Sequence, residues 1–257
     1  MSRSTLRPES LPGGRLARAA QAAAAAAPDT KPGKKTAAPA ASKGSGEIRI
    51  IGGQWKRTRL PVPQRPGLRP TPDRVRETLF NWLGQDLTGW RCLDAFAGTG
   101  ALGLEAASRG AASVVLVEQD GELLARLQQH VQRLQARSVQ VRRGDGVAAL
   151  RQCAAASLDL VLLDPPFDSA LFQPALQAAA QAVGPQGWVY LEAPQAWDEA
   201  ALAPLGLALY RHLRAGAVHA HLLRRVPAAD CAASTTWIFV AVAASATSTS
   251  FKVQVTE

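Results

Sequence analysis

The segment Cys92-Leu-Asp-Ala-Phe-Ala-Gly-Thr-Gly-Ala-Leu-Gly103 decides the fold class. It begins as an apolar strand, passes through a G-x-G-x-x-G loop, and continues into the helical pattern Leu102–Ser108. Glycines in such a loop allow a tight turn and a close approach of the backbone to a ligand at the helix start. Taken alone, the loop favours a dinucleotide site in an open α/β sheet.

Strands and helices alternate along the chain after Arg91, and a second helical pattern covers Leu123–Leu134. This alternation predicts a doubly wound, mostly parallel sheet. After Pro204, two further strands joined at Gly216 predict an antiparallel closing pair, which completes a Rossmann-like sheet of seven strands. The predicted strands are Cys92–Ala97, Val114–Glu118, Val139–Arg142, Leu158–Asp164, Trp188–Glu192, Leu207–Leu213 and Val218–Leu223.

Three acidic residues follow three successive strands: Asp94, Glu118 and Asp145. A carboxylate beside the glycine loop would repel a pyrophosphate and attract an ammonium group. S-adenosylmethionine carries an ammonium, a sulfonium and no phosphate, so the acids favour it over NAD. Glu118 is expected to bind the ribose hydroxyls, and Asp145 the adenine amino group. For each acid taken singly, the alternative is a helix N-cap.

The run Asp164-Pro165-Pro166-Phe167 follows a strongly apolar strand. Ligands bind at such strand ends in open parallel sheets. The two prolines lack an N–H, so the run offers carbonyl and carboxylate acceptors, and Phe167 adds a flat apolar face. This chemistry suits an amino group on a flat ring and suits a phosphate poorly. A purely structural loop is the alternative for the motif on its own.

The segment before the glycine loop predicts a β-hairpin at residues 47–60, with its turn at Gly52-Gly53. A proline-rich extended stretch follows to residue 70. Thr71 and Pro72 then predict a helix N-cap and first helical position. The apolar face of that helix consists of Val75, Leu79, Phe80 and Leu83, and Arg74 and Arg76 fall off this face.

Positive charge is concentrated in the first 80 residues. The chain of 257 residues has a net charge of +9, with +6 in residues 1–50, +5 in residues 51–80 and −2 in the remainder. This asymmetry predicts a polyanion bound by the N-terminal part, although a solvated basic tail explains residues 1–46 equally simply. Trp55 could stack on a nucleotide or pack against the hairpin. Four residues are expected to hold RNA phosphates: Lys56, Arg57, Arg59 and Arg69.

Composition narrows the remaining classes. Residues 1–46 read as a disordered basic Ala/Pro-rich tail, and residues 227–257 as a tail without an assigned role. No apolar run approaches the ~20 residues of a membrane helix. Three scattered cysteines and four histidines away from carboxylates predict neither disulfides nor a metal site. A cytoplasmic location is expected, with an organelle transit peptide as the open alternative.

The glycine loop together with Asp164-Pro-Pro-Phe167 resembles the Rossmann-type amino-methyltransferases. Arg49-Ile-Ile-Gly-Gly-Gln-Trp-Lys-Arg57, Gly67-Leu-Arg-Pro-Thr71 and Asp73-Arg-Val-Arg-Glu-Thr-Leu-Phe-Asn-Trp82 narrow this resemblance to the RsmD family, over residues 47–226. Those enzymes use S-adenosylmethionine to methylate N2 of one guanine in bacterial 16S ribosomal RNA. In the family the last strand usually carries an aromatic residue, where this chain has Val218-His-Ala-His221.

The resemblance implies a monomeric methyltransferase domain at 71–226, an RNA-binding segment at 47–70, and a partner in the assembling small ribosomal subunit. The implied catalytic residues are Asp164, Pro165, Pro166 and Phe167. The implied cofactor-binding residues are Asp94, Phe96, Ala97, Gly98, Gly100, Glu118, Gln119, Asp145 and Gly146. Two other hypotheses remain open: an amino-methyltransferase acting on adenine N6 of DNA or RNA, and a non-catalytic RNA-binding assembly factor.

Overall fold

The computed structural model describes residues 46–63 and 70–226. The predictions for both tails, for Arg69 and for Cys231 lie outside the described residues. Among the described residues, no helix has the length and apolar character needed to cross a membrane.

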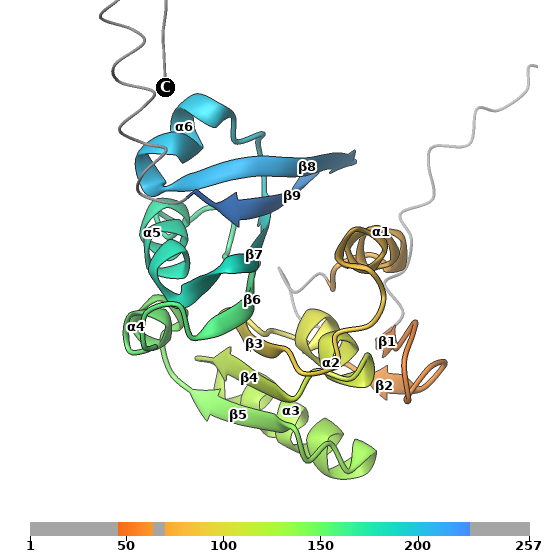
Figure 1. Cartoon of the computed structure of the whole chain (residues 1–257). Coiled ribbons are helices and arrows are strands. Elements are labelled where there is room, and N and C mark those ends of the chain that lie inside the picture. The colour runs from red at the N-terminus through yellow and green to blue at the C-terminus, as the bar shows by residue number, and fades with distance from the viewer. Residues whose placement is uncertain (1–45, 64–69, 227–257) are drawn as a thin grey trace, which may run out of the picture. The chain divides into compact units, whose positions relative to one another are not determined.

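A seven-stranded sheet forms the centre of the described chain, in the order β5-β4-β3-β6-β7-β9-β8 (Figure 1). The first five strands in this order are parallel, and β9 runs antiparallel to both β7 and β8. The predicted doubly wound sheet with an antiparallel closing pair is therefore confirmed. The strands are β3 Arg91–Asp94, β4 Ser113–Glu118, β5 Val139–Arg143, β6 Leu158–Leu163, β7 Val183–Ala193, β8 Leu207–Ala215 and β9 Val218–Arg225.

Helices cover both faces of the sheet, because side chains alternate between the faces and both sets are apolar. One face, with Cys92, Leu162 and Tyr190, packs against α1, α2 and α3. The other face, with Leu163 and Leu191, packs against α4, α5 and α6. The helices are α1 Asp73–Leu83, α2 Ala101–Ser108, α3 Gly121–Leu134, α4 Gly146–Arg151, α5 Phe172–Ala182 and α6 Glu199–Leu202, the last followed by the short turn η1 Ala203–Leu205.

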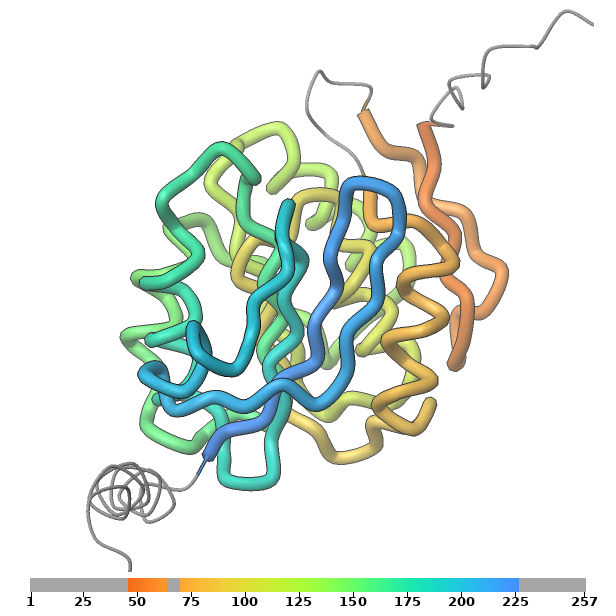
Figure 2. The backbone as a smooth tube through the Cα atoms, turned by 90° about the horizontal axis from the view of Figure 1, so that it is seen from above, coloured from red at the N-terminus to blue at the C-terminus, as the bar shows by residue number. Residues whose placement is uncertain are grey.

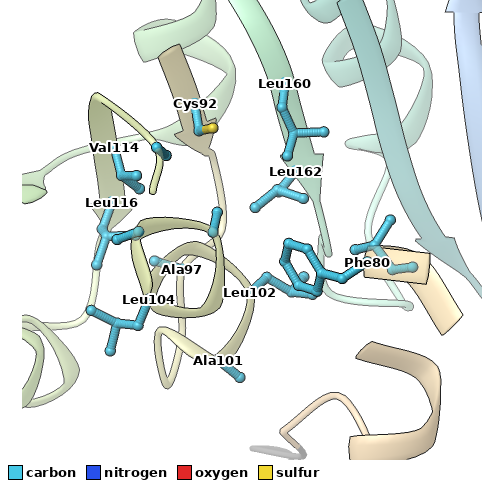
Figure 3. Close-up of a cluster of buried hydrophobic side chains, with 14 of the residues drawn as sticks. Phe80, Cys92, Ala97, Ala101, Leu102, Leu104, Val114, Leu116, Leu160 and Leu162 are labelled. Atoms are coloured by element: carbon cyan, nitrogen blue, oxygen red, sulfur yellow. The ribbon is translucent and has the colours of Figure 1, made fainter. Parts of the chain in front are cut away.

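The core beneath α1 and α2 is drawn in Figure 3, where Phe80 and Leu102 lie beside the strand residues Leu160 and Leu162. Helix α2 sits very close to the sheet. A Cβ placed on Gly103 would lie 2.2 Å from the Leu116 side chain, so any larger residue would force Leu116 to move. The third glycine of the loop thus serves helix–strand packing, as the motif predicts.

The N-terminal hairpin exists, but its predicted turn is wrong. Strands β1 Glu47–Arg49 and β2 Arg59–Pro61 pair antiparallel through a long connection, residues 50–58, and not through a two-residue turn. A Cβ on Gly53 would lie 1.8 Å from the Ser108 carbonyl oxygen, so the glycines let this connection lie against the end of α2. Lys56 and Arg57 consequently belong to the connection, and only Arg59 lies on the strand.

Helix α1 differs from its prediction in two ways. Pro72, and not Thr71, occupies the N-cap position, and proline has no side-chain acceptor to cap the helix. The side chain of Thr71 hydrogen-bonds Glu192. Arg76 was expected off the buried face, yet its side chain is only 1% exposed. Its guanidinium lies 3.3 Å from Glu105 and 2.5 Å from Asp73. A charged side chain can be buried here because carboxylates compensate it.

Candidate active site

Three carboxyl groups meet where neighbouring parallel strands end. Asp94 is the last residue of β3, Asp164 directly follows β6, and Glu192 is next to the last residue of β7. Strand alternation places all three on the sheet face that carries α1 and α2. Glu192 was not predicted from the sequence, although it is a single acid in the otherwise apolar stretch Trp188–Ala193.

Burial dominates the electrostatics of this acidic cluster, Asp94, Asp164 and Glu192. It raises the pKa of Asp94 to about 7, and the carboxylates of Glu118 and Glu192 add to the shift. The pKa of Asp164 is raised well above its usual range by burial, then by Glu192 and Asp94. Burial also raises the pKa of Glu192. Carboxylates in this state favour a cation placed among them, because it offsets both causes.

Glu192 is held by named partners. The Tyr190 hydroxyl donates to its Oε1 at 2.9 Å, and the Thr71 side chain forms a further hydrogen bond with it. Arg76 adds a favourable charge and also donates to the Thr71 carbonyl at 3.2 Å. The start of α1 is therefore tied to the end of β7 at the acidic cluster.

Asp94, the last residue of β3, has an incompletely partnered carboxyl group beside the glycine loop. Its Oδ2 accepts from the Gly103 N–H at 3.0 Å and the Phe96 N–H also supports the carboxyl group, whereas the buried Oδ1 has no partner of full hydrogen-bond geometry within the described chain. Gly98 and Gly100 have left-handed backbone, with φ of 51° and 79°. Phe96 is partly buried and Ala97 is buried beside them. The orphaned oxygen fits the ammonium group of S-adenosylmethionine, which can donate to it.

Glu118 and Asp145 follow the next two strands. Glu118 accepts from the Gly98 N–H and the Asp120 N–H, both at 2.8 Å, so each oxygen retains a lone pair for a hydroxyl. Asp145 caps α4 by accepting from the Ala148 N–H at 2.7 Å, which is the alternative that the sequence left open. Gln119 is exposed.

Gly146, the first residue of α4, packs tightly on the glycine loop. A Cβ placed there would lie 2.0 Å from the Ala95 carbonyl oxygen. The loops after β3 and β5 are therefore in contact, which brings the predicted cofactor residues to one edge of the sheet.

The two proline carbonyls of the Asp164–Phe167 run differ. The Pro166 carbonyl already accepts from Ser169 Oγ at 2.6 Å and from the Ser169 N–H at 3.1 Å. The Pro165 carbonyl accepts from no residue that the structure describes. Asp164 and the Pro165 carbonyl are therefore the acceptors that the run leaves for a ligand amine.

Phe167 lines a small aromatic hollow of about 240 Å³. The opposite wall includes Pro194 and Trp197, from the loop after β7. The backbone N–H of Trp197 donates to Nε2 of buried His221 at 3.0 Å. Because Nε2 accepts, the ring carries its proton on Nδ1, which faces the Leu191 carbonyl at 3.4 Å. The sequence analysis gave neither Trp197 nor His221 a role.

His221 belongs to a group of three imidazoles with His212 and His219 on β8 and β9. The ring centres of His212 and His221 are 4.8 Å apart, and Nε2 of His212 lies 3.0 Å from Nδ1 of His219. Among the described residues, no group of three His, Cys, Asp or Glu side chains has the arrangement of a metal site.

The predicted RNA-binding residues occupy different places. Lys56 and Arg57 line a hollow of about 440 Å³ between the hairpin connection and α1. Arg59 lies outside it and forms an ion pair with Glu47 at 3.5 Å. Arg69 is outside the described residues. Trp55 packs partly buried against the core, which favours the packing alternative.

Comparisons with known proteins show the family to which this chain belongs. The family model described as "Conserved hypothetical protein 95" matches residues 48–224. Ribosomal RNA small subunit methyltransferase D of Escherichia coli K12 is 41% identical over 188 residues, which are 71% of this chain and 92% of the relative. The chain belongs to the RsmD family.

Two further proteins match a similar part of this chain. The protein of the same name from Haemophilus influenzae is 38% identical over 178 residues, which cover 67% of this chain and 91% of the relative. The solved structure of the Escherichia coli protein yhhF superposes with a TM-score of 0.61 at 35% identity, over 70% of this chain and 99% of that one. The described site thus lies within the part that the RsmD family shares.

Proposed function

We propose that this chain methylates the exocyclic N2 amino group of one guanine in the 16S RNA of the small ribosomal subunit, using S-adenosylmethionine. The observation that carries the proposal is the buried Asp164 carboxyl group followed by the Pro165 carbonyl, two acceptors side by side without a competing N–H. The names of the relatives, which are small-subunit ribosomal RNA methyltransferases, support the RNA substrate.

The residues present fit the cofactor. Asp94 Oδ1 is a buried oxygen in need of a donor, and Glu118 keeps acceptor capacity at the end of β4. We assign Asp94 to the ammonium group, Glu118 to the ribose hydroxyls, and the loop of Phe96, Ala97, Gly98 and Gly100 to the close backbone contact. Gln119 and Gly146 flank the adenosine. Asp145 is assigned to the adenine amino group through the oxygen that does not cap α4.

When bound, S-adenosylmethionine supplies an electrophilic methyl group on a sulfonium. Asp164 and the Pro165 carbonyl accept one N–H each from the guanine amine, which draws the nitrogen towards tetrahedral geometry and exposes its lone pair. Phe167 holds the ring by stacking on a base taken out of its own stack. Much of the acceleration then comes from fixing the amine in line with the methyl group.

The proton that leaves the nitrogen has an acceptor at hand. Burial and the neighbouring carboxylates raise the pKa of Asp164, so its carboxylate is a stronger base than an exposed aspartate. Asp164 Oδ is therefore assigned to receive this proton, with release to water as the second route.

The identity of the methylated base is the most specific part of the proposal. Methylation of adenine N6 is the second candidate. Two acceptors and an aromatic face serve any exocyclic amine, so the choice of guanine rests on the RsmD relatives. The enzyme is expected in the cytoplasm as a monomer, acting on RNA of an assembling small subunit.

The test is a methylation assay with unmodified 16S RNA transcribed in vitro and with small subunits from a strain that lacks the enzyme. The product is digested to nucleosides, which are identified by mass spectrometry. N2-methylguanosine formed in an S-adenosylmethionine-dependent reaction is the expected result. N6-methyladenosine would establish the runner-up. Absence of any methylated nucleoside, with S-adenosylmethionine shown by calorimetry to bind, would contradict both.

A further inference from the structure

The hollow of about 440 Å³ beside α1 lies away from the acidic cluster and takes no part in the chemistry above. Its lining comes from three segments: the hairpin with its connection, one stripe of α1 continued by Gln85, and Arg109 directly after α2. Figure 2 shows the hairpin running alongside α1, on the side away from α4 and α5. The lining residues used below are Lys56, Arg57, Glu77, Asn81, Gln85 and Arg109.

We propose that this hollow is a binding site for a phosphodiester group of the RNA substrate, away from the methylated base. The inference rests on the proposed function, because it names where a second part of the same RNA is held. Asn81 lies eight residues after Asp73, about 12 Å along the axis of α1. The start of α1 reaches the acidic cluster through Thr71. A strand with one nucleotide at Asp164 can therefore place another along α1.

The charges of the hollow favour an anion. Lys56 and Arg57 are exposed, and neither forms an ion pair with another described residue. Arg109 forms the floor with a side chain only 4% exposed, held by Glu105 at 2.8 Å and stacked on Phe80 at 4.6 Å. Glu77 is the single acidic side chain of the lining. Arginine binds phosphate in a planar two-point geometry, which a fixed wall of donors supports.

A chain of amide hydrogen bonds directs further donors into the hollow. Arg109 Nη1 donates to Gln85 Oε1, and Gln85 Nε2 donates to Asn81 Oδ1. Since Asn81 uses its oxygen as an acceptor, its NH2 group remains as a donor. The wall of α1 therefore ends in N–H groups, which is the polarity that a phosphate oxygen requires.

The backbone gives an independent indication. Four non-glycine residues of the described chain have positive φ, and two of them, Arg57 at 70° and Gln85 at 67°, line this hollow. Such conformations cost free energy and concentrate at functional sites. Glycine would adopt the backbone conformation of Arg57 without strain, so the backbone alone does not require arginine at this position.

Two substitutions preserve the fold and remove the site. Arg57→Gly relieves the positive φ while it deletes the guanidinium. Its control is Arg126→Ala, which removes the same charge from the exposed side of α3, outside the hollow. Asn81→Asp keeps the acceptor for Gln85 but replaces the NH2 donor by a charge. Its control is Gln177→Glu, which adds the same charge to the exposed side of α5.

The measurement is the affinity of the full chain for unmodified 16S RNA against salt concentration. Arg57→Gly is expected to flatten the logarithmic salt slope by about 0.7–0.9, one phosphate contact, and Asn81→Asp to weaken binding about tenfold. Both controls should match the wild type. S-adenosylmethionine affinity should be unchanged in all four variants.

Wild-type binding by Arg57→Gly and Asn81→Asp, or losses in the controls as large as theirs, would overturn the phosphate site while leaving the methylation proposal intact. Failure of the wild-type chain to methylate the RNA would remove the proposed function, and the inference with it. The two failures are distinguished by the nucleoside analysis of the wild-type reaction.

Discussion

Asp164 and Glu192 lie at the ends of the adjacent strands β6 and β7. Burial is the largest cause of the raised pKa of Asp164, and the carboxylate of Glu192 is the second. The pair therefore contains an acidic group whose ionisation is costly in the protein alone. A cation placed beside it would lower that cost, which is the charge that the proposed sulfonium cofactor carries.

The first prediction concerns Asp164→Asn. The variant keeps the size of the side chain and loses the carboxylate, so turnover should fall by roughly 10²–10⁴-fold. S-adenosylmethionine affinity should change far less. Wild-type kcat/KM should also decline at acid pH with a midpoint above the ordinary carboxylate value of 3.8, because the pKa of Asp164 is raised. More than a tenth of wild-type turnover in the variant would remove Asp164 from the mechanism.

The second prediction concerns Glu118→Ala. Loss of the acceptors for the ribose hydroxyls should weaken S-adenosylmethionine binding by roughly ten- to hundred-fold, measured by calorimetry. Glu122→Ala, which removes the same charge from the exposed first turn of α3, is the control and should bind normally. An unchanged dissociation constant in a folded Glu118→Ala protein would contradict the assignment. NAD should displace no cofactor, because Asp94 repels its pyrophosphate.

The third prediction concerns stability. Glu105 is fully buried and accepts from Arg76, from Arg109 and from the N–H groups of Ile51 and Gly52 at 2.8 and 2.7 Å. Glu105→Ala leaves the buried guanidinium of Arg109 without a carboxylate and that of Arg76 with Asp73 alone, which should cost about 3–5 kcal/mol of unfolding free energy.

A second ion pair provides the control for Glu105. Asp159 pairs with Arg91 at 3.0 Å, but both side chains are at least a third exposed. Asp159→Ala should therefore cost about 0–1 kcal/mol. Denaturant unfolding of both variants tests the contrast, and equal losses would show that the buried network contributes no more than a surface pair.

The fourth prediction concerns His221. Burial lowers its pKa from 6.5 to about 4, so the folded protein binds fewer protons here than the unfolded chain between these values. Neutral His221 therefore contributes to the free energy of unfolding above pH 6.5. This contribution, up to about 3 kcal/mol, is lost as the pH falls towards 4.

His221→Gln tests this, because glutamine can accept from the Trp197 N–H and does not titrate. The unfolding free energy of the wild type should decline relative to the variant as the pH is lowered from 6.5 to 4. Parallel pH curves for the two proteins would contradict the linkage.

Much of the fold could be predicted because it depends on local pattern. The apolar strands, the glycine loop and the antiparallel closing pair each have a short-range signal, and all seven strands occur where expected. The predicted hairpin turn was wrong because Gly52-Gly53 looks like a two-residue turn. In the structure the Gly52 carbonyl accepts from Ser108 at the end of α2, 56 residues further along the chain, and no local pattern contains this contact.

Site residues could be predicted from the sequence where they lie at the ends of predicted strands. They could not be predicted where tertiary contacts determine their position. Asp94, Glu118 and Asp164 are placed by the strands that precede them. Glu192 looks like a strand residue, and Arg76 like a solvent-facing one, until α1 and β7 are brought together. Thr71 illustrates the same limit: its local signal is a helix cap, and its partner in the structure is Glu192.

The position of Glu105 bears on how the N-terminal hairpin can be inherited. The carboxylate that anchors the hairpin connection belongs to α2, the helix that also begins at the cofactor loop. Residues 46–63 are therefore not a transferable module: grafted onto another Rossmann-like enzyme, they would lack their anchor. Conversely, a chain shortened to begin at α1 would expose a carboxylate and two guanidinium groups adapted to a dry interior. The hairpin connection and α2 are therefore coupled, so a change in one of them has to be matched in the other.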